Sequence, residues 1–140
     1  MTKQLLLGTT LQFIGAPLVD NWADCAKINT AGGVLIEAGR IVVADDASTL
    51  RAAHPSAEIT DYGDDLITAG FVDAHMHYPQ TAMIASWGKQ LIDWLNTYTF
   101  PEESHFGDRA YADAVAADTR DIALVNGTTT LTSCCTIHPE

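Results

Sequence analysis

The residue types best suited to chemistry lie in one short run, FVDAHMHYPQ, which covers residues 71–80. His75 and His77 are two residues apart in a segment whose apolar residues predict a buried strand. Side chains alternate between the two faces of a strand, so both imidazoles are expected on one face, about 6–7 Å apart along the strand. Their nitrogens could then turn toward a common point, where zinc or iron would find two of its usual ligands.

The residues around the two histidines favour a binding site. Asp73 is expected on the same face, which adds a third polar group to a strand that should be buried. Gly70 opens the strand and Pro79 ends it, so the histidines lie at its C-terminal tip. In a (β/α)8 barrel, that tip is where active sites are built. The spacing alone leaves a chance occurrence open, because an H-x-H pair can also arise by accident in a chain with five histidines.

Residues 1–67 are expected to form a small β-rich segment that supports the rest structurally. The predicted strands cover residues 4–7, 11–15, 33–37, 40–44 and 58–61, with turns at 8–10 and 62–65 and a short helix over 45–53. The run GVLIEAGRIVVA places Ala38 and Gly39 between two β-branched segments, which predicts a β-hairpin with a tight turn.

Residues 68–140 are expected to begin a parallel sheet. A strand is predicted over 66–77, and a helix over 108–126 is capped by Asp108 and stopped by Gly127. A β-branched strand follows over 128–136. The side of the helix predicted to be apolar carries Tyr111, Val115, Ile122 and Val125. The order strand, helical connection, strand defines a βαβ unit and therefore an α/β fold class with a parallel sheet.

Composition and charge exclude several classes of protein. Apolar residues make up 47% of the 140 residues, which is typical of a globular chain. The formal charge of −11 argues against binding to nucleic acid or to an anionic membrane. Cys25, Cys134 and Cys135 form no C-x-x-C spacing, so we expect reduced thiols, the last two near the end of a buried strand. The N-terminal apolar run is too short for a signal peptide, and a cytoplasmic location is expected.

The motifs also resemble a known family. GFVDAHMH is similar to the first-strand signature of the amidohydrolase superfamily, and the extension HYPQTAMIASWGKQLIDWLNTYTFPEE, together with NGTTTLTSCCTIHPE, resembles the guanine deaminases. The resemblance covers nearly all of residues 66–140. It implies the start of a (β/α)8 TIM-type barrel of a metal-dependent hydrolase, preceded by a β-rich segment of a composite β-sandwich domain.

The resemblance implies a site that binds one zinc ion and a purine. His75 and His77 would be metal ligands, and the loop containing His77, Tyr78, Pro79 and Gln80 would contact guanine. The implied reaction is attack of a zinc-activated water on guanine, which yields xanthine and ammonia. Asp73 and His138 are weaker candidates for residues that support the ligands. Four aromatic residues could wall the purine pocket or belong to the core, and core is favoured for most of them: Trp87, Trp94, Tyr98 and Phe100.

The resemblance leaves part of the catalytic machinery unassigned. Residues 78–140 offer neither a further metal-binding histidine and aspartate nor a proton-shuttling carboxylate in the expected order of elements. The chain is therefore interpreted as the N-terminal part of a homodimeric guanine deaminase, inactive on its own. Two alternatives stay open at this point. One is another amidohydrolase, related to cytosine deaminases or chlorohydrolases, and the other is a non-catalytic β-rich interaction fragment.

Overall fold

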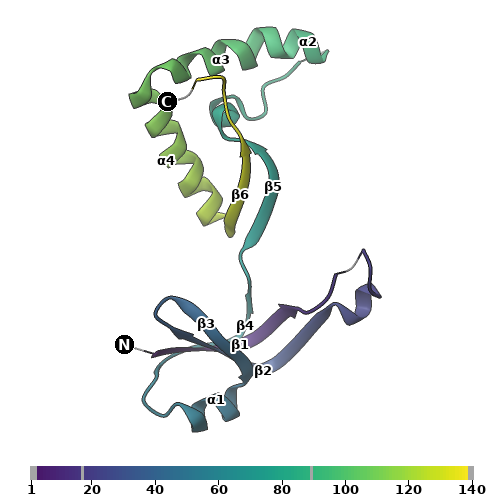
Figure 1. Cartoon of the computed structure of the whole chain (residues 1–140), viewed down its shortest axis with the longest axis vertical. Coiled ribbons are helices and arrows are strands. Elements are labelled where there is room, and N and C mark those ends of the chain that lie inside the picture. The colour runs from purple at the N-terminus through teal and green to yellow at the C-terminus, as the bar shows by residue number, and fades with distance from the viewer. Residues whose placement is uncertain (1–2, 17, 89, 139–140) are drawn as a thin grey trace. The chain divides into compact units, whose positions relative to one another are not determined.

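The computed structural model describes residues 3–16, 18–88 and 90–138, although for Trp22 it describes only the backbone. The chain divides into two compact units, Met1–Ala69 and Gly70–Glu140 (Figure 1). In the described part of the chain, no helix is both long and apolar enough to cross a membrane.

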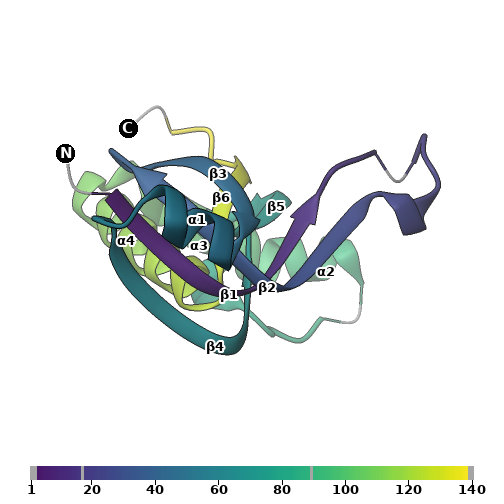
Figure 2. The ribbon, with the colours of Figure 1, turned by 90° about the horizontal axis from the view of Figure 1, so that it is seen from below.

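The first unit is built on a mixed sheet. Its strands are β1 (Lys3–Phe13), β2 (Ala26–Glu37), β3 (Arg40–Asp46) and β4 (Glu58–Thr68), in the order β3-β2-β1-β4. β1 runs antiparallel to β2 and parallel to β4. The far ends of β1 and β2 continue as a two-stranded ribbon toward a short 3-10 turn, η1 (Trp22–Asp24) (Figures 1 and 2).

The core of the first unit lies between this sheet and the helix α1 (Ala47–Ala53). Leu5 and Leu7 alternate onto one face of β1, Leu35 joins them from β2, and Leu50 covers them from the helix. All four side chains are buried. The predicted hairpin between β2 and β3 is confirmed: Ala38 and Gly39 both have positive φ angles, 52° and 73°, as a type I′ turn requires.

Two turns predicted inside the first unit were wrong. β1 runs through residues 8–10 without turning, and a register shift against β2 between Gly8 and Thr10 absorbs the irregularity. Residues 62–65 lie within β4 as a large bulge opposite Gly8, because Asp61 pairs with Leu7 and Leu66 pairs with Thr9. The residues on either side of each segment pair with neighbouring strands, which keeps both segments within their strands.

The second unit contains the predicted βαβ arrangement. β5 (Phe71–His77) and β6 (Thr128–Cys134) are parallel neighbours, which confirms the parallel pairing. The connection consists of η2 (Tyr78–Met83), α2 (Leu91–Trp94), a π-helical turn η3 (Leu95–Thr99), α3 (Phe100–Ser104), η4 (His105–Gly107) and α4 (Arg109–Val125). Figure 1 shows α2 to α3 following one continuous helical path.

The helix α4 begins and ends as predicted. The Asp108 carboxylate accepts a hydrogen bond from the backbone N–H of Ala110 at 2.9 Å, and Gly127 has a φ of 80° just after the last turn. The predicted apolar side is only partly right. Val115 is buried against Phe106, whereas Val125 is 87% exposed, because the buried contacts of α4 lie in its first three turns.

The expectation of a buried strand at the histidines was wrong for the described chain. Phe71 and Val72 are 63% and 65% exposed, and β6 is the only strand paired with β5 among the described residues. The strand predicted over 66–77 is also interrupted at residues 69–70, so its first residues belong to β4. A Cβ atom on Gly70 would lie 2.2 Å from the Thr129 hydroxyl oxygen, which explains why the strand is entered through a glycine.

Candidate metal centre

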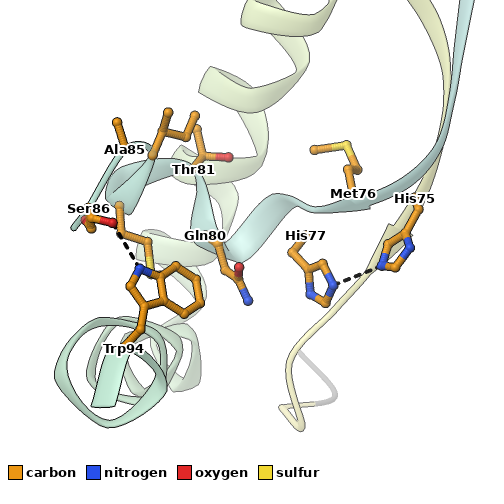
Figure 3. Close-up of a pocket in the computed structure, with 10 residues that line it drawn as sticks. His75, Met76, His77, Gln80, Thr81, Ala85, Ser86 and Trp94 are labelled. Carbon is orange, nitrogen blue, oxygen red and sulfur yellow. Dashed lines mark hydrogen bonds between the residues drawn. The ribbon is translucent and has the colours of Figure 1, made fainter. Parts of the chain in front are cut away.

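His75 and His77 lie together on one face of β5. Their Nε2 atoms are 3.3 Å apart and their ring centroids 5.3 Å apart, and both side chains are exposed (Figure 3). Alternation along the strand thus places them as the sequence predicts. Cys134, the last residue of β6, completes a group of three potential ligands whose nitrogen and sulfur atoms all lie within 4.8 Å of one another.

The imidazole pair fits a zinc ion. Two nitrogens bound to zinc at about 2.0–2.1 Å, at a tetrahedral angle, stand about 3.3 Å apart. The two Nε2 atoms already have this separation, and their rings point toward each other. Without a metal, a protonated ring nitrogen on one side can donate a hydrogen bond to the other. The donor set and its spacing therefore suit a divalent ion of the zinc type.

Asp73 acts on the backbone of the segment that carries the two histidines. Its carboxylate accepts a hydrogen bond from the backbone N–H of His75 at 3.1 Å. The β5–β6 register shifts between Asp73 and Met76, so this hydrogen bond spans a bulge immediately before His77. Asp73 therefore supports the strand through its backbone.

The loop after the histidines is anchored from several sides. The backbone N–H of Tyr78 donates to the Ser133 hydroxyl at 3.3 Å, and the side chain of Pro79 is fully buried. The Tyr78 ring meets Phe106 edge to face, with ring centroids 5.6 Å apart. Burial raises the pKa of the Tyr78 hydroxyl above its ordinary value, with smaller electrostatic contributions from Cys135 and Asp113. The hydroxyl is therefore neutral at physiological pH.

Gln80 is held in a defined orientation. Its Nε2 donates to the Glu103 carboxylate of α3 at 3.0 Å, in a half-buried position. Among the described residues, the side-chain carbonyl oxygen of Gln80 and its second N–H have no hydrogen-bond partner, so both can bind another group. Figure 3 shows this amide between His77 and Trp94.

A cavity of about 600 Å³ opens beside these groups. It is lined by His75, His77, Gln80, Met83, Ser86 and Trp94, among others. The Trp94 indole N–H donates to the Ser86 carbonyl at 3.1 Å, which fixes the ring as one wall (Figure 3). A cavity of this size, mostly apolar with a few polar groups, is typical of small-molecule sites.

Sequence reasoning missed or misplaced several residues around the cavity. Trp94 lines the cavity, whereas Trp87 and Phe100 are 73% and 56% exposed, so the core interpretation was wrong for these two. His138 lies beside Gly107 of η4, away from the cavity lining of the described residues. Cys134 was expected near the end of a buried strand but is exposed. Its position beside His77 depends on the register of two strands that are distant in sequence, which no local pattern reveals.

Comparisons with known proteins show which proteins this chain resembles. Residues 32–57 match the family described as the imidazolonepropionase-like composite domain of bacteria. The chain is 45% identical over 82 residues to the guanine deaminase of Escherichia coli K12, an alignment that covers 59% of this chain and 19% of that protein. The chain therefore spans about a fifth of the length of this curated relative.

Solved structures extend the likeness to almost the whole chain. A crystal structure of guanine deaminase from Bradyrhizobium japonicum matches 99% of this chain and 30% of its own, with a TM-score of 0.91 and 33% identity. A guanine deaminase from C. acetobutylicum with bound guanine in the active site matches 98% of this chain and 31% of its own, with a TM-score of 0.81 and 25% identity. Both matches cover the N-terminal β-rich unit as well as the histidine-bearing unit.

Proposed function

We propose that this chain supplies the metal-binding and purine-binding part of a zinc-dependent enzyme that hydrolyses guanine to xanthine and ammonia. Its sequence and fold resemble the N-terminal portion of guanine deaminases of the amidohydrolase family, which supports the proposal. The observation that carries the proposal is the pair His75 and His77, spaced for one ion at the edge of the cavity. We also propose that β5 and β6 are the first two strands of a (β/α)8 barrel. Their parallel pairing and the structural neighbours support this.

Different residues of the chain would bind the zinc ion and position its ligands. His75 and His77 would hold zinc through their Nε2 atoms, with neutral imidazoles as the ligands. When bound, zinc supplies a water nucleophile at neutral pH. Asp73 fixes the backbone of His75 and thereby keeps the two rings at their spacing. The group that would move protons is left unassigned.

Gln80 and Trp94 suit a planar purine. The free carbonyl and N–H of the Gln80 amide match the mixed donor and acceptor edge of guanine, and the contact with Glu103 keeps the amide from rotating. The fixed Trp94 ring offers a flat apolar wall on the side of α2. The buried ring of Pro79 limits the movement of the loop that carries Gln80.

We expect the 140-residue chain by itself to bind zinc weakly and to leave guanine unchanged. The described residues that line the cavity include no aspartate or glutamate, and Glu103 behind them is engaged by Gln80. A proton shuttle would have to come from outside this set. A cytoplasmic location and a homodimeric assembly stay predictions from the sequence.

A chimaera tests the proposed function. The chain replaces the matching portion of the Escherichia coli guanine deaminase, and xanthine formation and zinc content are measured together. We expect activity on guanine that His77→Ala abolishes, whereas His105→Ala, a change of an exposed histidine away from the cavity, preserves it. A zinc-loaded chimaera that retained full activity after His77→Ala would refute the assignment. Preference for cytosine or a chlorinated ring over guanine would favour the other amidohydrolase alternative.

A further inference from the structure

We propose that Glu103 is a positioning residue that sets the selectivity of the cavity, because its carboxylate fixes which end of the Gln80 amide is free to bind a purine. This inference rests on the proposed purine-binding role of Gln80. It adds a residue of α3 that is not among the described residues lining the cavity. The chain would then offer a purine one acceptor and one donor in a fixed order.

The chemistry of the contact determines the orientation of the amide. The two ends of a glutamine amide are similar in shape, but only the nitrogen donates hydrogen bonds and only the oxygen accepts them. An ionised carboxylate accepts hydrogen bonds and donates none. The Gln80 nitrogen, 3.0 Å from a carboxylate oxygen of Glu103, is therefore the end that faces α3. The carbonyl oxygen is turned away from Glu103, and Gln80 lines the cavity.

A flipped amide would be unfavourable at this position. The flip would place the carbonyl oxygen of Gln80 against the Glu103 carboxylate, so that two acceptors would face each other without a proton between them. It would also lose a hydrogen bond to a charged group, which is stronger than one between neutral groups. The contact is half-buried, so competing water reaches it only in part. The carboxylate therefore strongly favours one orientation of the amide.

Both ends of the contact are anchored to the same core. Gln80 directly follows Tyr78 and the fully buried Pro79. Glu103 lies three residues before the buried Phe106. The rings of Tyr78 and Phe106 meet edge to face, with centroids 5.6 Å apart. A shift of α3 or of the loop would disturb this aromatic pair, so the core maintains the distance between the amide and the carboxylate.

A fixed amide can discriminate between similar purines. Guanine carries N–H donors beside ring-nitrogen acceptors, and a carbonyl at a fixed position binds an N–H but repels a bare ring nitrogen. A guanine analogue with carbon in place of the nitrogen that Gln80 contacts keeps its shape but loses this hydrogen bond. A site built to bind a ligand N–H rejects an analogue without it, because the polar group of the site is left unpaired.

Two substitutions at position 103 separate the orientation of the amide from the mere presence of a partner. In Glu103→Gln, the new amide can accept from the Gln80 nitrogen or donate to its oxygen, so both orientations are allowed and the affinity for guanine should fall about twofold. In Glu103→Lys, the ammonium only donates and turns the Gln80 oxygen toward α3, so the affinity should fall roughly tenfold. Glu102→Gln is the matched control, because this adjacent carboxylate contacts Tyr111 and His105.

The orientation of the amide is measured by NMR on the isotope-labelled 140-residue chain. The side-chain amide signal of Gln80 is identified by its loss in Gln80→Glu. We expect one of its two protons to be protected from exchange with water in the wild type and in Glu102→Gln, and this protection should disappear in Glu103→Lys. If both protons exchanged equally fast in the wild type, the inference would be overturned.

Selectivity is measured in the chimaera with the Escherichia coli enzyme. The probes are deazaguanines, in which carbon replaces one ring nitrogen, used as inhibitors of guanine turnover. We expect at least one of them to bind roughly tenfold more weakly than guanine, and to lose this disadvantage in Glu103→Lys. The KM for guanine should rise roughly tenfold in Glu103→Lys while kcat changes little, because the lost hydrogen bond serves binding.

The outcomes separate this inference from the proposed function. If no deazaguanine is discriminated, or if Glu103→Lys or Glu102→Gln discriminates to the same extent as would be expected for the opposite variant, the role of Glu103 is overturned while guanine turnover stands. Glu103→Gln keeps the shape of the side chain, so unchanged protection and unchanged KM in this variant overturn the inference even if Glu103→Lys fails to fold. A zinc-loaded chimaera that leaves guanine unchanged contradicts the proposed function itself, and the amide signal of the chain then decides whether Glu103 fixes Gln80.

Discussion

Replacing Phe106 with alanine should unfold the second unit at much lower denaturant. Phe106 is 2% exposed and is the central side chain of the core of this unit. Its ring meets Tyr78 at 5.6 Å and Tyr111 at 5.4 Å between centroids, both edge to face. Tyr78 directly follows His77, so the loss of this support also loosens the segment that carries the proposed metal site.

The size of the effect follows from these contacts. Phe106→Ala leaves a large cavity and should lower the free energy of unfolding by about 3–5 kcal/mol. Phe106→Leu keeps most of the apolar volume but loses two edge-to-face contacts at about 0.5–1.5 kcal/mol each, which gives a loss of about 1–3 kcal/mol. Phe100→Ala is the matched control. Its ring is 56% exposed, so the loss should stay below about 1 kcal/mol.

Urea unfolding measures these differences. The fluorescence of Trp87 and Trp94, both in the second unit, is followed in a Trp22→Phe background. We expect unfolding midpoints to fall in the order wild type, Phe100→Ala, Phe106→Leu, Phe106→Ala. If Phe106→Ala and Phe100→Ala unfolded at the same urea concentration, Phe106 would not be the centre of this core, and the packing argument would be refuted.

Three further changes probe individual elements. Ala38→Asn should raise the free energy of unfolding of the first unit by about 1 kcal/mol, because asparagine tolerates the positive φ of 52° better than alanine; urea midpoints measure this. Asp108→Ala removes the cap on the N–H of Ala110 and should cost about 1 kcal/mol, measured by far-ultraviolet circular dichroism during unfolding. The hydrogen bond that the Tyr111 hydroxyl donates to Glu102 raises the pKa of Tyr111 in the folded protein. The stability that this hydrogen bond contributes is therefore complete below about pH 10 and is lost as the pH rises through the pKa of Tyr111 in the folded protein. Tyr111→Phe should flatten the plot of unfolding free energy against pH in that range.

Each of these predictions has its own contrary result. If Ala38→Asn left the urea midpoint of unfolding unchanged, the turn would carry no backbone strain at Ala38. Asp118→Ala, on the exposed side of α4, is the control for Asp108→Ala, and equal losses would argue against capping. If the stability of Tyr111→Phe declined above about pH 10 as much as that of the wild type, groups other than Tyr111 would cause the decline.

Local sequence patterns determined the features whose causes are local. The positive-φ turn at Ala38 and Gly39 needs only two adjacent residues, and the start and end of α4 need only Asp108 and Gly127. The two-residue spacing of the histidines likewise puts both rings on one side of a strand, whatever the strand packs against. The order of strand, helices and strand also predicted the parallel pair β5 and β6.

Only the tertiary structure decided features that arise from pairing between distant segments. β1 continues through residues 8–10 and β4 through residues 62–65 because neighbouring strands supply hydrogen-bond partners around both irregularities, which outweighs local turn preference. The contact of Gln80 with Glu103 and the place of Cys134 beside His77 join residues 23 and 57 positions apart along the chain. Such proximity depends on how strands and helices pack, and a periodicity read along one segment carries no information about the register of another.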